Sequence, residues 1–268
     1  MPIVITWKSF QNTPNIWGEP LVTALDIGHG YGVTPPLSTE EDDKQSMFVK
    51  KDGYLFDCVD LCIEEGSTVC ILGSNGSGTS TLLRILAKLD KPLEGKVHHA
   101  SGIRIGYFDQ FAVDDIFSAG EHEQSSSWRG GSKHDVTALS ILMGQFPQKT
   151  EQELRGQLSA FGLGPILVTT TDIKFLSGGE RSRLRLASLM LEQPDVLFME
   201  SPTSNLDAES VEAMVHGLKL WNGTLVMASH DANFLRSLEA KCYVIVQPEG
   251  KLRRVQGGID AYIKAFAG

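Results

Sequence analysis

Short apolar runs alternate with longer segments of helical periodicity along most of this chain. The runs are four to six residues long, and they occupy residues 69–72, 103–108, 196–199, 224–228 and 243–246. Residues 80–89, 136–144 and 151–161 show helical spacing instead, the last behind a capping box of Thr150 and Glu153. The first of these helices is expected to bury Leu82, Leu83, Ile85, Leu86 and Leu89. Largely apolar strands that alternate with helices predict an α/β fold with a mainly parallel sheet, covered on both faces.

Two polar stretches interrupt this pattern. Residues 34–52 contain a double proline and the acidic run 40–43, and residues 118–135 are poor in aliphatic side chains. Because strong motifs of one site lie on both sides of each stretch, we interpret both as insertions in surface loops rather than as domain boundaries.

Composition and charge narrow the class of protein. The 268 residues are enough to bury a large core, and 41% hydrophobic with 21% charged residues is ordinary for a soluble globular protein. The net charge of −9 argues against broad binding of nucleic acid, which needs a basic face. No apolar run approaches the roughly 18 residues of a membrane span, and no signal-peptide pattern opens the sequence. We therefore expect a soluble, cytoplasmic protein without a membrane span of its own.

Two smaller features have simple interpretations. Residues 251–254 form a compact basic run, which we expect in a solvated hairpin. The four cysteines lack the spacing of a zinc site and are expected to be small buried residues: Cys58, Cys62, Cys70 and Cys242.

Residues 73–80 match the phosphate-loop pattern G-x-x-x-x-G-K-[ST] at every position but one. Thr79 stands where the pattern has lysine. An apolar run precedes this segment and a helical pattern follows it, which is the context that a phosphate loop requires. The backbone N–H groups can still bind phosphates, but the positive charge that reaches the β- and γ-phosphates is lost. The candidate nucleotide-binding residues of this segment are Gly73, Asn75, Gly76, Gly78, Thr79, Ser80 and Thr81.

A second motif combines a capping box with two glycines: Leu176, Ser177, Gly178, Gly179 and Glu180. Ser177 and Glu180 are spaced to bond each other's backbone N–H groups at a helix start. The glycines let a phosphate held by another chain approach the helix N-terminus, where the helix dipole favours anions. Taken alone, the motif fits a generic capped helix equally well. Beside a phosphate loop in the same chain, the phosphate-binding interpretation is favoured.

The order of motifs resembles that of ATP-binding cassette (ABC) proteins. A glycine loop is followed by a glutamine, L-S-G-G-E, an apolar strand with an acidic end, and S-H-D, and the match runs from Tyr31 to Tyr262. Within that family the chain most resembles the second cassette of the ABC-F group, soluble proteins with paired cassettes that act on ribosomes. The phrases that carry this likeness are residues 55–61, 105–110, 202–207 and 229–235.

The resemblance implies a P-loop NTPase fold of ABC type, with a mainly parallel sheet core, an antiparallel β subdomain and a small helical subdomain at residues 136–176. Residues 1–268 are then a single nucleotide-binding domain, with ATP and Mg²⁺ as its cofactors. Tyr31 matches the aromatic residue that stacks on adenine, although a strand aromatic facing the core stays an alternative. Gln110 matches the glutamine that senses Mg²⁺ and the attacking water. Asp207 matches a residue that couples two cassettes, and His230 matches the histidine that contacts the γ-phosphate.

This chain departs from the family at three positions: Thr79, Glu200 and Ser201. The family strand ends in an aspartate that supports Mg²⁺ and a glutamate that polarises the attacking water, where this chain has Glu200 and Ser201. Serine cannot act as a general base near neutral pH. The resemblance implies Mg²⁺ ligation by Ser80, Gln110 and Glu200. With Thr79 and Ser201 both altered, we predict that ATP hydrolysis at this chain's own loop is very slow or absent.

The intact motif at residues 176–180 implies a partner. In the family, each site pairs one chain's glycine loop with the other's L-S-G-G-E, so this chain could complete a site on a second ABC cassette, in a homodimer or a heterodimer, with the ribosome as a further partner. One alternative is a slow ATPase in which Lys50 or Lys51 replaces the lost lysine. Another is the ATP-binding subunit of a membrane transporter. ABC-F members carry two cassettes and a long charged linker, whereas this chain has one cassette, and the sequence leaves open whether it is complete.

Overall fold

The structure is a computed structural model that describes residues 20–33, 52–109, 136–204, 206–221 and 223–266. The predicted insertions at 34–52 and 118–135 therefore lie outside the described residues, except for Asp52. The chain divides into two compact units. We call the unit of Pro20–Gln110, Gln193–Ser204 and Leu218–Gly268 the sheet unit, and the unit that contains Phe111–Glu192 and Asn205–Gly217 the helical unit.

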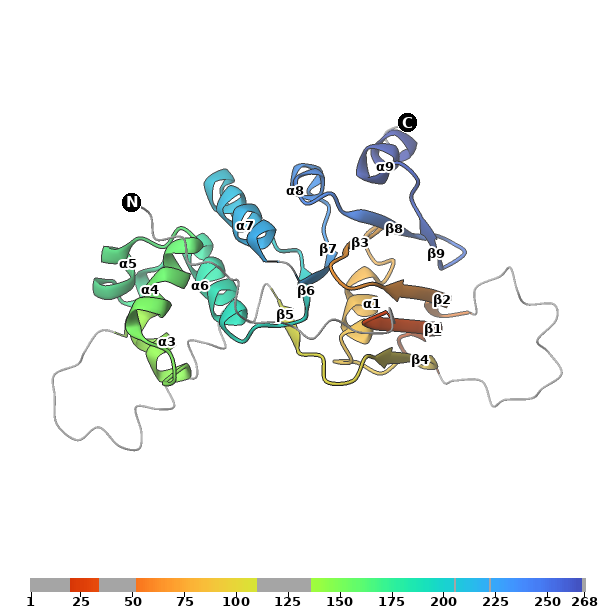
Figure 1. Cartoon of the computed structure of the whole chain (residues 1–268). Coiled ribbons are helices and arrows are strands. Elements are labelled where there is room, and N and C mark those ends of the chain that lie inside the picture. Colours follow the sequence, from red (N-terminus) through yellow and green to blue (C-terminus); the bar gives the residue numbers. More distant parts are fainter. Residues whose placement is uncertain (1–19, 34–51, 110–135, 205, 222, 267–268) are drawn as a thin grey trace. The chain divides into compact units, whose positions relative to one another are not determined.

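The sheet unit contains the predicted mainly parallel sheet, whose strands are labelled in Figure 1. Its strand order is β5-β6-β7-β3-β8-β9, and every neighbouring pair is parallel except β8 and β9. The strands are β3 (Thr68–Gly73), β5 (Ile105–Phe108), β6 (Val196–Glu200), β7 (Thr224–Ala228), β8 (Lys241–Val246) and β9 (Lys251–Arg254). The basic run at 251–254 pairs back on β8, so the expected hairpin is confirmed.

A second, antiparallel sheet of order β2-β1-β4 belongs to the same unit. Its strands are β1 (Val22–Gly30), β2 (Tyr54–Ile63) and β4 (Glu94–His99). One continuous hydrophobic core joins residues of both sheets with those of helix α1 (Thr79–Leu86), which follows β3 directly. Because the phosphate loop lies between β3 and α1, both of its ends are anchored in this core.

The helix after the phosphate loop is shorter than its apolar periodicity predicts. Leu82, Leu83, Ile85 and Leu86 are fully buried, as expected, but Leu89 is 51% exposed. Lys88 has a φ of 59°, in the left-handed region that ends helices, so the chain turns away before Leu89 can reach the core. The sheet unit also contains α8 (Ala232–Ser237) and α9 (Gly258–Phe266).

Among the described residues, the first elements of the helical unit are the two helices that the periodicity predicts. They are α3 (Ala138–Gln145) and α4 (Glu151–Ala160), followed by α5 (Pro165–Thr170), the 3₁₀ turn η1 (Ile173–Phe175) and α6 (Gly178–Leu191). The capping box before α4 is confirmed: Thr150 N–H donates to Glu153 Oε2 at 2.7 Å, and Glu153 N–H donates to Thr150 Oγ1 at 3.3 Å. Helix α7 (Ala208–Leu220) starts in this unit and ends in the sheet unit.

The cysteines divide into a buried pair and an exposed pair, so the expectation of four buried thiols is wrong for two of them. Cys70 and Cys242 are buried partners in the register of β3 and β8. Cys58 and Cys62 are exposed on β2 together with Asp60. Successive side chains of a strand point to opposite faces, and these three positions share the face that is turned away from the core.

Candidate nucleotide-binding site

The phosphate loop keeps the backbone that its glycines make possible. Gly76 and Gly78 have φ values of 80° and 94°, which residues other than glycine rarely adopt. A Cβ atom on Gly73 would lie 2.2 Å from Ser77 Oγ, and one on Gly78 would lie 2.9 Å from the buried Phe56 ring. These glycines are therefore needed both for the turn and for close approach of the chain.

The start of α1 is open to an anion. Gly78 is its N-cap, no side chain caps it, and its first turn contains no acidic residue. The first N–H groups of a helix have no partner within the helix, and the helix dipole places partial positive charge there. Ser77 Oγ is buried and finds no hydrogen-bond partner in the part of the chain that the structure describes. Thr79 adds no charge, so backbone dipoles would have to supply any attraction for a phosphate at this point.

Tyr31 directly follows β1 and is 69% exposed. This exposure rules out the alternative in which the ring faces the core. The hydroxyl lies 3.0 Å from Oγ1 of the buried Thr81, and the ring packs edge-on against His29 with centroids 5.4 Å apart. The ring is thus held beside α1 and is largely exposed, as stacking on a base would require.

The carboxylate expected at the metal position is bonded to a tyrosine. Glu200, at the end of β6, accepts a hydrogen bond from the Tyr107 hydroxyl at 3.1 Å. Arg84 of α1 forks onto Asp90 with Nε–Oδ2 and Nη2–Oδ1 distances of 2.7 and 3.2 Å, and this bond lowers the pKa of Asp90. The hydrogen bond to Asp90 chiefly, and the charges of Tyr107 and Glu200 to a smaller extent, raise the pKa of the Arg84 guanidinium. The sequence argument missed Arg84, although it lies four residues after Ser80 and therefore on the same face of α1.

The chemistry of these groups fits Mg²⁺, which prefers hard oxygen ligands and retains several waters or phosphate oxygens. Ser80 offers a half-buried hydroxyl on the first turn of α1, and Glu200 offers a half-buried carboxylate. Within residues 20–33, 52–109 and the later described ranges, no group of three or more His, Cys, Asp or Glu side chains could hold a metal alone. Because Mg²⁺ is usually bound by one or two carboxylates together with substrate phosphates, a cation here would share its ligands with a bound nucleotide. Gln110, the third expected ligand, lies outside the described residues.

The position after Glu200 holds no carboxylate and has an unusual backbone. Ser201 has a φ of 45°, which is rare for residues other than glycine and is often found at functional sites. Its N–H donates to the Ala228 carbonyl at 2.9 Å, and its own carbonyl accepts from Ser204 Oγ at 2.7 Å. The backbone is thus firmly held, while the hydroxyl cannot serve as a base.

His230 follows the buried strand β7 and is itself exposed, which excludes a core role for its ring. The next residue, Asp231, caps α8, with Oδ1 accepting from Phe234 N–H at 3.0 Å. The histidine therefore stands on a short, anchored turn at the end of the sheet where β3 and β6 also end.

In the helical unit, the L-S-G-G-E segment has the predicted reciprocal cap. Ser177 N–H donates to Glu180 Oε2 at 2.7 Å, and Glu180 N–H donates to Ser177 Oγ at 3.3 Å. A Cβ on Gly179 would lie 2.9 Å from Ser210 Oγ of α7, whereas one on Gly178 would meet nothing within 4 Å. Leu176 is buried, so the segment enters α6 from a fixed point.

Asp207 also belongs to the helical unit and is exposed at the start of α7. Its Oδ1 accepts from Ser210 N–H at 2.7 Å. Hydrogen bonding from the Ser210 hydroxyl first, and from its N–H second, lowers the pKa of the carboxyl group. The side chain therefore has a structural task as a helix cap, whatever further contact it makes.

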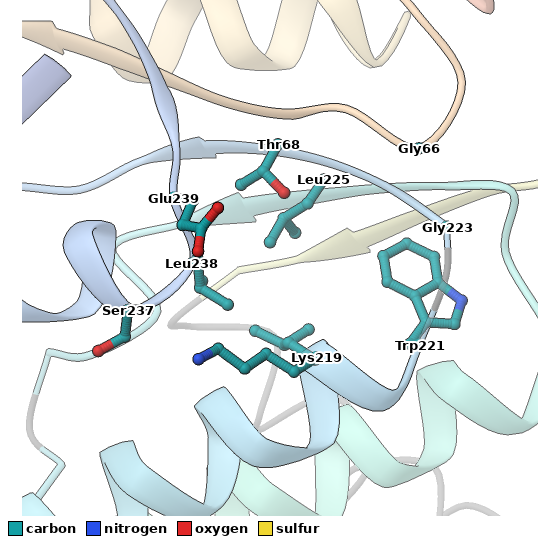
Figure 2. Close-up of a pocket in the computed structure, with 10 residues that line it drawn as sticks. Gly66, Thr68, Lys219, Trp221, Gly223, Leu225, Ser237, Leu238 and Glu239 are labelled. Carbon is teal, nitrogen blue, oxygen red and sulfur yellow. The ribbon is translucent and has the colours of Figure 1, made fainter. Parts of the chain in front are cut away.

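A cavity of about 430 Å³ in the sheet unit is separate from the phosphate loop (Figure 2). Lys219, Trp221, Leu225, Leu238 and Glu239 are among the residues that line it. Thr68, at the first residue of β3, is another, whereas the phosphate loop follows the last residue of the same strand. With a rise of roughly 3.3 Å per residue, the two places lie at opposite ends of β3. The cavity is therefore not the predicted nucleotide site.

Comparisons with known proteins agree on one family. The sequence matches the family model described as "ABC transporter" over residues 56–204. It is 30% identical to ATP-binding cassette sub-family F member 3 of Rattus norvegicus, over 85% of this chain and 29% of that protein. It is 31% identical to Protein GCN20 of Saccharomyces cerevisiae, over 86% of this chain and 28% of that protein. The chain thus spans less than a third of the length of these relatives.

Solved structures share the fold. The cbiO1 protein of Clostridium perfringens, part of an ABC transporter complex, superposes with a TM-score of 0.63 at 18% identity, covering 93% of this chain and 92% of that one. The dimeric structure of MJ0796, a bacterial ABC transporter cassette, gives a TM-score of 0.59 at 22% identity, covering 88% and 99%. At such identities the likeness concerns the fold alone. None of the helices in the described ranges is long and apolar enough to cross a membrane.

Proposed function

The chain belongs to the ABC family of ATP-binding cassettes, and from this premise we propose that it binds ATP with Mg²⁺, hydrolyses it very slowly or not at all, and acts by nucleotide-dependent pairing with another cassette. One observation carries the proposal. The loop keeps its phosphate-binding backbone at Gly76 and Gly78, while the two positions that would supply charge and basicity are Thr79 and Ser201.

Binding would rest on groups that do not depend on the missing lysine. The open N-terminus of α1 would take the phosphates, and the exposed face of Tyr31 would stack on adenine. Ser80 and Glu200, with Gln110, would hold Mg²⁺. When bound, the metal neutralises charge on the β- and γ-phosphates.

Hydrolysis would lack two groups at once. Removing one preorganised donor from an active site typically costs about 100- to 1,000-fold in rate, and losses of groups that act together do not simply multiply. Arg84 does not replace the lysine, because its guanidinium is already forked onto Asp90. We therefore place this chain among cassettes that hold ATP rather than turn it over.

Pairing is supported by a contrast between two motifs. The loop and metal positions are altered at Thr79 and Ser201, whereas residues 176–180 match the family motif. The capping box and glycines of residues 177–180 would complete the phosphate site of a competent cassette. A homodimer would instead contain two equivalent impaired loops. We further propose that this pairing acts in translation, with the ribosome as the larger partner; the likeness to a sub-family F protein supports this context. Co-sedimentation of the chain with ribosomes in ATP, and its loss in ADP, would test that context.

The test of the chemistry compares turnover with binding. We expect the natural chain to bind a fluorescent ATP analogue in the presence of Mg²⁺, and to hydrolyse ATP at least about 100-fold more slowly than the Thr79→Lys, Ser201→Glu double variant. Thr79→Ser keeps an uncharged hydroxyl and should be as slow as the natural chain. Equal rates for the natural chain and the double variant would refute impaired hydrolysis.

A further inference from the structure

Tyr107 and Glu200 come from neighbouring parallel strands, and their side chains meet beyond the end of the pairing. In the register of β5 and β6, Tyr107 is opposite Phe198, two residues before Glu200. Residues two apart on a strand share one face, so the Tyr107 ring lies on the same face as the Glu200 carboxylate. The phenol hydroxyl then reaches Glu200 Oε2 at 3.1 Å.

The hydroxyl is the donor in this pair. A tyrosine phenol keeps its proton at neutral pH and an ionised carboxylate can only accept, so Tyr107 donates to Glu200. Arg84 supplies positive charge nearby, but its Nε and Nη2 groups both donate to Asp90. Among the hydrogen bonds of the described residues, the bond from Tyr107 is the one that fixes the Glu200 carboxylate.

A fixed carboxylate matters more for glutamate than for aspartate. Glutamate has one more rotatable bond, and ordering a long side chain costs conformational entropy. A hydrogen bond to one oxygen removes much of that freedom and leaves the other oxygen to face a ligand. In metal sites, hydrogen bonds of this kind to a ligating carboxylate typically change metal affinity by about 10- to 100-fold.

We propose that Tyr107 is a positioning residue for the metal: it holds Oε2 of Glu200 and thereby presents Oε1 to the Mg²⁺ that accompanies the nucleotide. This inference rests on the proposed function, because it requires the site to bind Mg²⁺ with ATP. It adds a residue that the loop and L-S-G-G-E motifs do not include, and it explains how a glutamate is accommodated where the family has aspartate.

The test measures the Mg²⁺ dependence of nucleotide binding in the full chain. The fluorescent ATP analogue is titrated with protein in EDTA, and Mg²⁺ is then titrated into the complex. For Tyr107→Phe we expect the Mg²⁺ concentration at half effect to rise about 10- to 100-fold, with binding in EDTA unchanged. Tyr54→Phe is the matched control, because Tyr54 also donates its hydroxyl to a glutamate, Glu94 Oε1 at 2.8 Å, in the antiparallel sheet. Its Mg²⁺ dependence should equal that of the natural chain.

A second variant background distinguishes a positioning role of Tyr107 from a general loss of binding. In Glu200→Asp the shorter carboxylate no longer reaches the phenol, so adding Tyr107→Phe should have little further effect on Mg²⁺ binding. An unchanged Mg²⁺ dependence in Tyr107→Phe would overturn the inference, as would equal losses with and without Mg²⁺ or an undiminished effect in the Glu200→Asp background. If the natural chain shows no Mg²⁺-dependent binding at all, the proposed function itself fails, and the inference fails with it.

Discussion

Two helix starts in this chain carry the motifs that the sequence predicts to bind phosphate, and they differ in how each is held. Helix α1 begins at left-handed Gly78 without any side-chain cap, whereas α6 begins behind the reciprocal bonds of Ser177 and Glu180. The first start has Thr79 where the phosphate-loop pattern has lysine, and the second has every residue of its motif. The comparison teaches that backbone shape and catalytic side chains are separable. The backbone conformation of the loop is fixed by its glycines and by the core beneath them, so it does not depend on the lysine.

The largest expected effect is a loss of stability when the glycine loop before α1 is changed. Gly78→Ala places a Cβ in a left-handed backbone, 2.9 Å from the buried Phe56 ring, and should lower the free energy of unfolding by about 2–4 kcal/mol. Gly178→Ala is the control on the other side, because its Cβ would meet nothing within 4 Å, and its cost should be under about 0.5 kcal/mol. Urea denaturation monitored by fluorescence gives both values. Similar costs for the two variants would contradict the difference drawn between the helix starts.

A smaller effect concerns the cap itself. Ser177→Ala removes the oxygen that accepts from Glu180 N–H and should reduce stability by about 1 kcal/mol. Ser80→Ala, on the uncapped first turn of α1, should change stability by less than about 0.5 kcal/mol. The same denaturation experiment without nucleotide compares them. A cost for Ser80→Ala equal to that of Ser177→Ala would mean that the hydroxyl of Ser80 has a structural rather than a ligand role.

The smallest effect is a dependence on pH in the loop region. The bond from Arg84 lowers the folded-state pKa of Asp90, so its contribution is present above the ordinary carboxyl pKa of about 4 and is lost as pH falls through the lowered folded value. The side chains are 39% and 35% exposed, so solvent screening keeps this contribution below about 1 kcal/mol. The stability difference between the natural chain and Asp90→Asn should therefore be constant near neutral pH and shrink below about pH 4. A difference that grows on acidification would contradict this pairing.

The sequence predicts the parts of the fold that depend on local pattern. The apolar runs of β6 and β7 and the capping boxes of α4 and α6 lie where their residues indicate. The exposed cysteines of β2 were also predictable, since Cys58 and Cys62 alternate with apolar residues in a strand of period two. The early end of α1 was less so, because a left-handed Lys88 has no clear signature in the sequence.

Features that depend on strand order could not be predicted. The bond between Tyr107 and Glu200 joins residues 93 apart in the chain, and it exists because β5 and β6 are neighbours in the sheet. Motif spacing locates Glu200 but contains no information on which strand lies beside it. The pairing of Asp90 with Arg84 could not be predicted either, because it depends on the turn after α1 rather than on helical periodicity.

The most direct test of the central claim, an impaired loop beside a competent L-S-G-G-E segment, is a mixing experiment. A tester chain carries Thr79→Lys and Ser201→Glu to restore the loop, and Gly178→Asp to place a carboxylate where a phosphate would approach α6. Gly178 has open space around it, so this change should leave the fold intact. The Thr79→Lys, Ser201→Glu chain serves as the positive control. We predict that the tester and the natural chain each hydrolyse ATP slowly alone, and that their mixture is at least about 10-fold faster than the sum of the two. A mixture no faster than that sum, with the positive control active, would contradict the claim.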